Sequence, residues 1–247
     1  MPNAARIREL LVSLPIYRPT RFLYQQLFDR DAIVRRRDRR VFYSSFVHPG
    51  DLVFDVGANL GNYSEALLAI GANVVAIEPD PRNQGILRKR FGSSVVLEAC
   101  ALGRTEGFAD LHLADRDDMS TLSAEWAASM KAQWQGSVRV VVKTLDLIAQ
   151  SYGVPTYVKI DAEGYDAEIL ASMSFCPEMV SFEFVPGSLT VTQSCIELLE
   201  KFQFNYVIEE RSRFELDRWV DHSEIETALA ALPIEIMYGD VFARKCT

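Results

Sequence analysis

The chain has 247 residues, 49% of them hydrophobic, and carries a net charge of −8. These values favour one large α/β domain with an extension and argue against a disordered chain. No apolar run reaches the roughly 18 residues that a membrane span needs. The four cysteines are scattered, and the first residues lack the pattern of a secretory signal peptide. We therefore expect a cytoplasmic protein with reduced thiols.

Charge is distributed unevenly along the chain. Residues 1–48 hold ten Arg and four acidic residues, a net charge of +6, which leaves −14 for the remainder. The five Arg within 35–40 are the densest part of this segment. Two interpretations are open. The arginines form a solvated helical face packed on the acidic body, or they form a binding site for an anionic partner, which would be an acceptor, a carrier-linked acceptor or a membrane surface. Nucleic acid is not an expected partner, because the body is acidic and aromatic residues do not interleave with the basic cluster.

The division into parts follows from the proline and glycine positions. Residues 1–47 are expected to form an N-terminal helical extension or cap, with two or three helices interrupted at Pro15 and Pro19. Pro49 and Gly50 mark the entry to the main domain, which we assign to residues 48–247.

The main domain opens with a strand and a glycine-containing turn. The apolar run 52–56 predicts a strand buried on both faces of a parallel sheet. In the turn that follows, Gly57 and Gly61 allow a tight bend and a close approach to a ligand. Asn59 lies between them, and asparagine tolerates a left-handed backbone better than most residues. This pattern is typical of a nucleotide-binding turn.

A helix, a second strand and an acid complete this unit. Residues 62–70 predict a helix capped by Gly71, and the strand 74–77 ends at Glu78. Glu78 follows Gly61 by 17 residues, close to the separation of about 20 found in nucleoside sites. One carboxylate there can accept hydrogen bonds from both ribose hydroxyls. The alternative is an ordinary strand-to-helix turn with a solvated Glu78.

Strands and helices alternate through the rest of the chain. We expect helices at 80–91, 124–134, 144–153, 166–173 and 192–202, and a last helix that ends near residue 231 after a capping box formed by Ser223 and Glu226. We expect strands at 95–100, 156–161, 180–185, 204–209 and 240–244, with an antiparallel excursion that pairs 108–113 with 138–142 around a polar loop at Ser120 and Thr121. This order predicts a doubly wound, mostly parallel α/β sheet with a late antiparallel hairpin at its edge.

Three charged residues lie in otherwise apolar strands. Lys159 and Asp161 point to one side of the sheet by the two-residue period, and Glu183 lies in the next strand. Buried charge is costly unless it is paired, so a Lys159–Glu183 ion pair is one interpretation. Asp161 ends its strand, at the edge where α/β sheets bind ligands. For Asp161 we therefore favour a functional role.

Metal-binding patterns are weak in this sequence. It has no His-x-x-x-His pair, Cys/His cluster or EF-hand spacing, so we predict no metal site. Asp161, Glu163 and Asp166 could gather a magnesium ion, but an acidic helix start explains Asp166 equally well. His48, which precedes the main domain, is a candidate base.

The glycine turn departs from a nicotinamide fingerprint, since Asn59 and Asn62 occupy two of its three glycine positions. The chain instead resembles the FkbM-type S-adenosylmethionine-dependent methyltransferases over roughly residues 50–210. The matching motifs are Phe54-Asp55-Val56-Gly57-Ala58-Asn59-Leu60-Gly61, Ala76-Ile77-Glu78-Pro79, Ala101-Leu102-Gly103, Thr144-Leu145-Asp146 and Val158-Lys159-Ile160-Asp161-Ala162-Glu163-Gly164. Their joint occurrence in this order is specific.

This resemblance implies a Rossmann-like fold of the class I methyltransferase type and methyl transfer from S-adenosyl-L-methionine to a hydroxyl of a sugar, glycan or polyketide-like product. It implies that Glu78 holds the ribose, that Ala101 borders the adenine and that Asp161 lies near the sulfonium. The full set of cofactor residues that it implies is Asp55, Gly57, Ala58, Asn59, Gly61, Asn62, Glu78, Pro79, Ala101 and Asp161.

The catalytic residues expected from this reading are Asp161, which would orient the acceptor and the sulfonium, and Glu163 or His48, either of which would remove the hydroxyl proton. A nicotinamide-dependent oxidoreductase and a catalytically silent S-adenosylmethionine-binding module are the alternatives, and Asp161 and Glu163 argue against the silent module. The sequence leaves open the identity of the acceptor and whether the protein forms a homo-oligomer.

Overall fold

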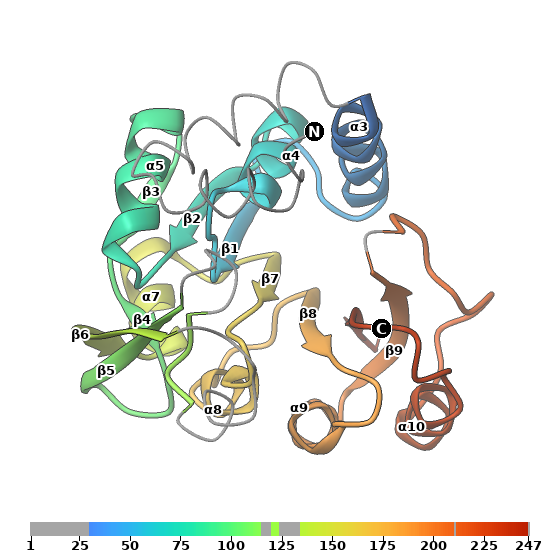
Figure 1. Ribbon diagram of the computed structural model, residues 1–247. Helices are drawn as coiled ribbons and strands as arrows, with labels where there is room; N and C mark the ends of the chain where they lie inside the picture. The colour runs from blue at the N-terminus through green and yellow to red at the C-terminus, as the bar shows by residue number, and fades with distance from the viewer. Residues whose placement is uncertain (1–29, 115–119, 124–133, 210, 247) are drawn as a thin grey trace, which may run out of the picture.

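The structure is a computed structural model that describes residues 30–114, 120–123, 134–209 and 211–246. Its centre is a seven-stranded sheet in the order β3-β2-β1-β7-β8-β10-β9 (Figure 1). The strands are β1 (Leu52–Val56), β2 (Asn73–Ile77), β3 (Val96–Glu98), β7 (Tyr157–Ile160), β8 (Met179–Phe184), β9 (Phe202–Ile208) and β10 (Gly239–Lys245). Only β10 runs against its neighbours, pairing antiparallel with β8 and β9. The predicted doubly wound, mostly parallel sheet with a late antiparallel pairing is confirmed.

Helices cover both faces of this sheet (Figure 1). One layer contains α3 (Arg30–Tyr43), α4 (Asn62–Ile70) and α5 (Pro81–Phe91), and the other contains α7 (Leu145–Tyr152), α8 (Asp166–Leu170), α9 (Thr190–Leu198) and α10 (His222–Ala230). Each layer closes its own apolar cluster. Along β1, Val53 belongs to the cluster under α4, whereas Phe54 and Val56 belong to the other. No described helix is both long enough and apolar enough to cross a membrane.

The expected antiparallel excursion forms a second, three-stranded sheet in the order β4 (Ala101–Leu102), β6 (Trp134–Lys143) and β5 (Gly107–Ala114). Its register pairs Phe108 with Val141, as the two apolar runs predicted. The short helix expected at 124–134 falls outside the described residues except for Trp134, which begins β6.

Helix termini follow the predicted caps with one exception. Asp80 caps α5 by accepting a hydrogen bond from the Arg82 backbone N–H at 2.8 Å, and Gly71 ends α4 in a left-handed conformation. The predicted capping box of α10 is wrong. Asp221 rather than Ser223 is the N-cap, and its side chain accepts from the backbone N–H of Glu224 at 3.0 Å. A carboxylate caps as well as a hydroxyl, so the same three-residue spacing starts the helix two residues earlier.

The end of α3 is packed onto the sheet. Any helices within residues 1–29 lie outside the described residues, but Tyr43 is 2% exposed and its ring lies 5.8 Å from that of Tyr157 in β7. The Arg39 guanidinium lies over the Tyr63 ring at 4.5 Å, and Arg36 forms an ion pair with Glu65 at 3.8 Å. The described part of the N-terminal segment therefore packs on α4 and the sheet through both apolar and charged contacts.

This packing predicts a large effect of truncating Tyr43. Tyr43→Ala should lower the free energy of unfolding by about 3–5 kcal/mol, as for other buried aromatic side chains, measured by urea denaturation. Val41→Ala is the matched control, since Val41 lies in the same helix and is 59% exposed; it should change stability by no more than about 0.5 kcal/mol. Equal effects of the two substitutions would contradict the packing of α3 on the sheet.

Candidate active site

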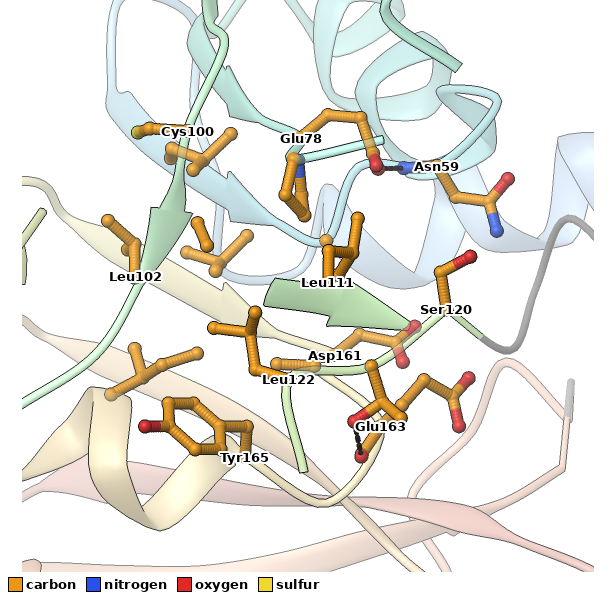
Figure 2. A pocket seen from close by; sticks show the side chains of 18 of the residues that line it. Asn59, Glu78, Cys100, Leu102, Leu111, Ser120, Leu122, Asp161, Glu163 and Tyr165 are labelled. Carbon is orange, nitrogen blue, oxygen red and sulfur yellow. Dashed lines mark hydrogen bonds between the residues drawn. The ribbon is translucent and has the colours of Figure 1, made fainter. Parts of the chain in front are cut away.

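A pocket opens at the carboxyl ends of β1, β2 and β7 (Figure 2). The empty space of this pocket, including open solvent at its mouth, is about 700 Å³. In open α/β sheets this edge is where ligands bind. Among the residues predicted for the site, seven line the pocket: Gly57, Asn59, Glu78, Pro79, Ala101, Asp161 and Glu163.

The floor of the pocket depends on Gly57. Its φ is +73°, and a Cβ there would lie 1.9 Å from the Asp161 carbonyl oxygen. The Gly57 N–H donates to the Ile77 carbonyl oxygen at 2.9 Å. Only glycine allows the turn to press against the end of β7 in this way. The turn therefore brings Asp161 to the same pocket as Glu78. Asn59 has a φ of 51°, the left-handed conformation that its residue type suggested.

Glu78 is held rigidly in the pocket wall. It is 4% exposed, and its carboxylate accepts hydrogen bonds from the backbone N–H groups of Asn59 at 2.6 Å and Asp80 at 2.8 Å (Figure 2). Burial raises the pKa of Glu78 to about 7, although these hydrogen bonds oppose the rise. The carboxylate also forms a hydrogen bond with the Asn83 side chain, and its two oxygens offer about four acceptor positions in all. An oriented carboxylate of this kind can accept hydrogen bonds from the two hydroxyls of a ribose.

The other residues predicted to hold the cofactor lie behind the pocket. Asp55 is fully buried and accepts a hydrogen bond from Ser64 Oγ at 2.6 Å. Ala58 belongs to the apolar cluster under α4. A Cβ on Gly61 would lie 2.4 Å from the Phe91 ring, so this glycine allows α4 and α5 to pack closely. Asn62 begins α4. These four residues support the turn from below and do not line the pocket.

Sequence reasoning missed the apolar wall. Cys100 and Leu102 follow β3, and Leu111 and Leu122 come from the small sheet and the loop beside it. The Thr121 hydroxyl donates to the Glu163 carbonyl oxygen at 2.8 Å, which ties this loop to the end of β7 (Figure 2). The polar pair at residues 120 and 121 was visible in the sequence, but the contact depends on the small sheet folding back over the pocket.

Lys159 has a different partner from the predicted one. Its side chain is 1% exposed, and Nζ lies 2.9 Å from Asp161 Oδ2, so the predicted Lys159–Glu183 ion pair is wrong. Both Lys159 and Asp161 project from the same face of the sheet, which puts them within direct reach. Burial alone would lower the pKa of Lys159, but Asp161, Tyr63, Asp240 and Asp55 raise it well above its usual value. Lys159 is therefore a charged group at the centre of the sheet.

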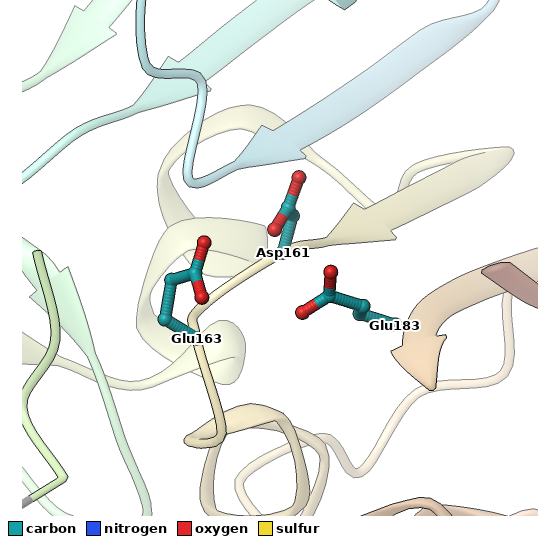
Figure 3. A group of neighbouring side chains, drawn as sticks. All are labelled: Asp161, Glu163 and Glu183. Atoms are coloured by element: carbon teal, nitrogen blue, oxygen red, sulfur yellow. The ribbon is translucent and has the colours of Figure 1, made fainter. Parts of the chain in front are cut away.

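Three carboxylates meet beside this ion pair. Oxygens of Asp161, Glu163 and Glu183 all lie within 4.8 Å of one another (Figure 3). Asp166, which the sequence grouped with the first two, is not part of this cluster. Its carboxyl is buried, and burial together with Asp161 raises its pKa to about 7. The end of the pocket near Asp161 is thus strongly acidic, and it can attract a positively charged group.

His48 does not join the site. Its side chain is 70% exposed, and Nδ1 lies 3.6 Å from Asp51 Oδ2. Because His48 precedes β1, it lies at the amino edge of the sheet, opposite the pocket. Glu163 therefore remains the only predicted proton acceptor that lines the pocket.

Two curated methyltransferases are similar to parts of this chain. A hexuronic acid methyltransferase, AglP, of Haloferax volcanii is 28% identical over 142 residues, which is 55% of this chain and 55% of that protein. A ribosomal RNA small subunit methyltransferase A of Chlamydia trachomatis is 37% identical over 62 residues, 25% of this chain and 22% of the relative. The chain therefore spans about half of the first relative and about a fifth of the second.

Solved structures and a family model were also compared. A TehB-like S-adenosylmethionine-dependent methyltransferase of Corynebacterium glutamicum superposes with a TM-score of 0.45 at 10% identity, covering 85% of this chain and 88% of that one. The model of the methyltransferase FkbM domain matches residues 55–233, so the match extends beyond the end near residue 210 that we expected. The chain belongs to the FkbM methyltransferase family.

Proposed function

We propose that the protein is an S-adenosylmethionine-dependent methyltransferase that methylates a hydroxyl group of a sugar, a glycan or a polyketide-like product. The observation that carries this proposal is the arrangement of acidic groups in one pocket. The fixed carboxylate of Glu78 lies in the pocket wall, and the acidic cluster around Asp161 lies at the pocket's end. AglP, whose name specifies a hexuronic acid, supports a sugar as the acceptor.

The residues fit this cofactor from one end of the pocket to the other. Glu78 would accept hydrogen bonds from the ribose hydroxyls, and the apolar wall at Ala101 would border the adenine. Asp161 would face the sulfonium, and its ion pair with Lys159 fixes the direction of its carboxylate. When bound, the cofactor supplies an electrophilic methyl group. The protein would hold the acceptor oxygen in line with it, and such positioning accounts for much of an enzyme's acceleration.

The alternatives fit less well. A nicotinamide dinucleotide would bring a pyrophosphate to a pocket lined by three carboxylates, those of Glu78, Asp161 and Glu163, and anions repel one another at such distances. A silent binding module would need no acidic cluster beside the cofactor. Binding of S-adenosylmethionine but not NAD argues against the oxidoreductase, and methyl transfer argues against the silent module.

Cofactor affinity should depend on the ionisation of Glu78. Only the carboxylate form accepts from both hydroxyls, and its pKa is about 7, so affinity for S-adenosylhomocysteine should fall as the pH drops from 8 to 6. Glu78→Ala should weaken binding at least about tenfold at pH 8. Glu78→Gln should bind weakly with little dependence on pH. Calorimetry measures these affinities, and Glu200→Gln, an exposed position, controls for net charge. Unchanged affinity in Glu78→Ala would remove Glu78 from the site.

Turnover should produce a methyl ether. The test incubates the protein with S-adenosylmethionine and a panel of neutral hexosides, hexuronates and phenolic or polyketide-like alcohols, with products identified by mass spectrometry. Asp161→Asn should lower turnover by about 10²-fold, because Asp161 would orient the reacting groups, with a smaller effect on cofactor affinity. Methylation on nitrogen or carbon would contradict the proposed reaction, and stabilisation by NAD alone would contradict the cofactor.

A further inference from the structure

Glu183 is a half-buried residue. It lies outside the sequence motifs that the chain shares with the family. It lies in β8, which pairs parallel with β7 so that Lys159 faces Ser181 across the two strands. Two residues further along the same face, Glu183 reaches the position beside Asp161. Figure 3 shows Asp161, Glu163 and Glu183 directed at one common space from the ends of β7 and β8. Their oxygens lie within 4.8 Å of one another.

This space continues the cofactor pocket. Asp161 and Glu163 line the pocket, whereas Glu183 is not among its lining residues. Glu183 therefore lies on the far side of these two carboxylates from Glu78. If the ribose binds at Glu78 and the sulfonium at Asp161, the acceptor has to enter beyond Asp161, because its oxygen must lie in line with the methyl–sulfur bond. That is the side on which Glu183 lies.

The three carboxylates differ in their surroundings. The Lys159 ammonium lies 2.9 Å from Asp161 Oδ2 and fixes the direction of this carboxylate. Glu183 is half-buried in a strand, and within the described part of the chain no hydrogen bond or ion pair engages its carboxylate. The neighbouring charges with the largest effect on it are four acids: Asp161, Glu163, Asp166 and Asp240.

A carboxylate in this environment binds a proton readily. Burial raises the pKa of Glu183 well above its usual value, and the four neighbouring acids raise it further. A base is most effective when its pKa lies near the working pH. Two cations oppose this rise in the pKa of Glu183. Lys159 offsets the negative charge of Asp161, and Arg39 offsets that of Asp240. Glu183 thus combines a fixed position with a high affinity for a proton.

We propose that Glu183 accepts the proton of the acceptor hydroxyl during methyl transfer. The inference rests on the proposed function. The oxygen–carbon bond forms while the carbon–sulfur bond breaks, the sulfur keeps the electron pair of the broken bond, and the hydroxyl proton passes to a Glu183 carboxylate oxygen. Asp161, held by Lys159, orients the reacting groups, and Glu163 lines the pocket beside them.

A pair of cofactor analogues tests the position of Glu183 without any acceptor. Sinefungin carries an ammonium group where the transferred methyl would be, and S-adenosylhomocysteine carries nothing there. Calorimetry measures the affinity of the protein for each analogue. Because both analogues contain the same nucleoside, the protonation of Glu78 affects both affinities equally. The ratio of the two affinities therefore reports on the charge at the acceptor side of the pocket. Sinefungin should bind at least about tenfold more tightly at pH 8. This advantage should shrink as the pH falls through the raised pKa of Glu183, because its carboxylate then becomes protonated.

Glu183→Gln should reduce the sinefungin advantage and remove most of its pH dependence while leaving the affinity for S-adenosylhomocysteine unchanged. Glu197→Gln, an equal change of charge at an exposed position in α9, should leave the ratio as it is. A ratio that Glu183→Gln does not alter would overturn the proposal. Failure of the unmodified protein to bind either analogue would instead contradict the proposed function.

Kinetics with an acceptor from the panel separates Glu183 from Glu163. Glu183→Gln should lower kcat by about 10²–10⁴-fold with little change in KM and should abolish the rise of kcat with pH, whereas Glu163→Gln should keep that rise. If Glu163→Gln abolishes the rise and Glu183→Gln retains it, the proton passes to Glu163 and the proposal is wrong.

Discussion

The buried ammonium group of Lys159 makes the acidic edge of the sheet possible. It projects from β7 with Asp55 of β1 directly beside it in the register, and it forms an ion pair with Asp161 at 2.9 Å. Asp240 also acts on its charge. Without the ammonium, these carboxylates would be like charges in a largely desolvated sheet, which is costly. Removing one partner of such a buried pair typically destabilises a protein by about 3–5 kcal/mol. Lys159 thus places a positive charge among these carboxylates, beside the pocket.

The same ammonium connects the acidic edge of the sheet to the N-terminal segment. Lys159 Nζ lies 4.2 Å from the centre of the Tyr63 ring, and the Arg39 guanidinium lies 4.5 Å from it. Cations over an aromatic face are attracted by its quadrupole. Arg39 belongs to α3 and Tyr63 to α4, so contacts made by α3 bear on the group that fixes Asp161. This gives part of the basic segment a structural role that is independent of any acceptor.

Local patterns were sufficient to predict much of the fold and part of the site. The glycine turn, Glu78 and Asp161 could be recognised because each depends on residues close in sequence and on the rule that parallel strands end at one edge. The partner of Lys159 could not be chosen, since both Asp161 and Glu183 lay within reach until the strand register was known. Leu111 and Leu122 enter the pocket through tertiary folding of the small sheet, which has no local signal. His48 failed as a candidate because it precedes its strand and so lies at the opposite edge.

The proposed function gives the pocket a direction, with the ribose at Glu78 and the sulfonium at Asp161. A crystal structure of the complex with S-adenosylhomocysteine tests that direction most directly. The account predicts both ribose hydroxyls on the Glu78 carboxylate, the adenine against Ala101 and Leu102, and the sulfur at the end of the pocket nearest Asp161, with open space between the sulfur and Glu183. A nucleoside bound in the reverse direction, with its adenine at Asp161, or bound outside this pocket, would contradict it.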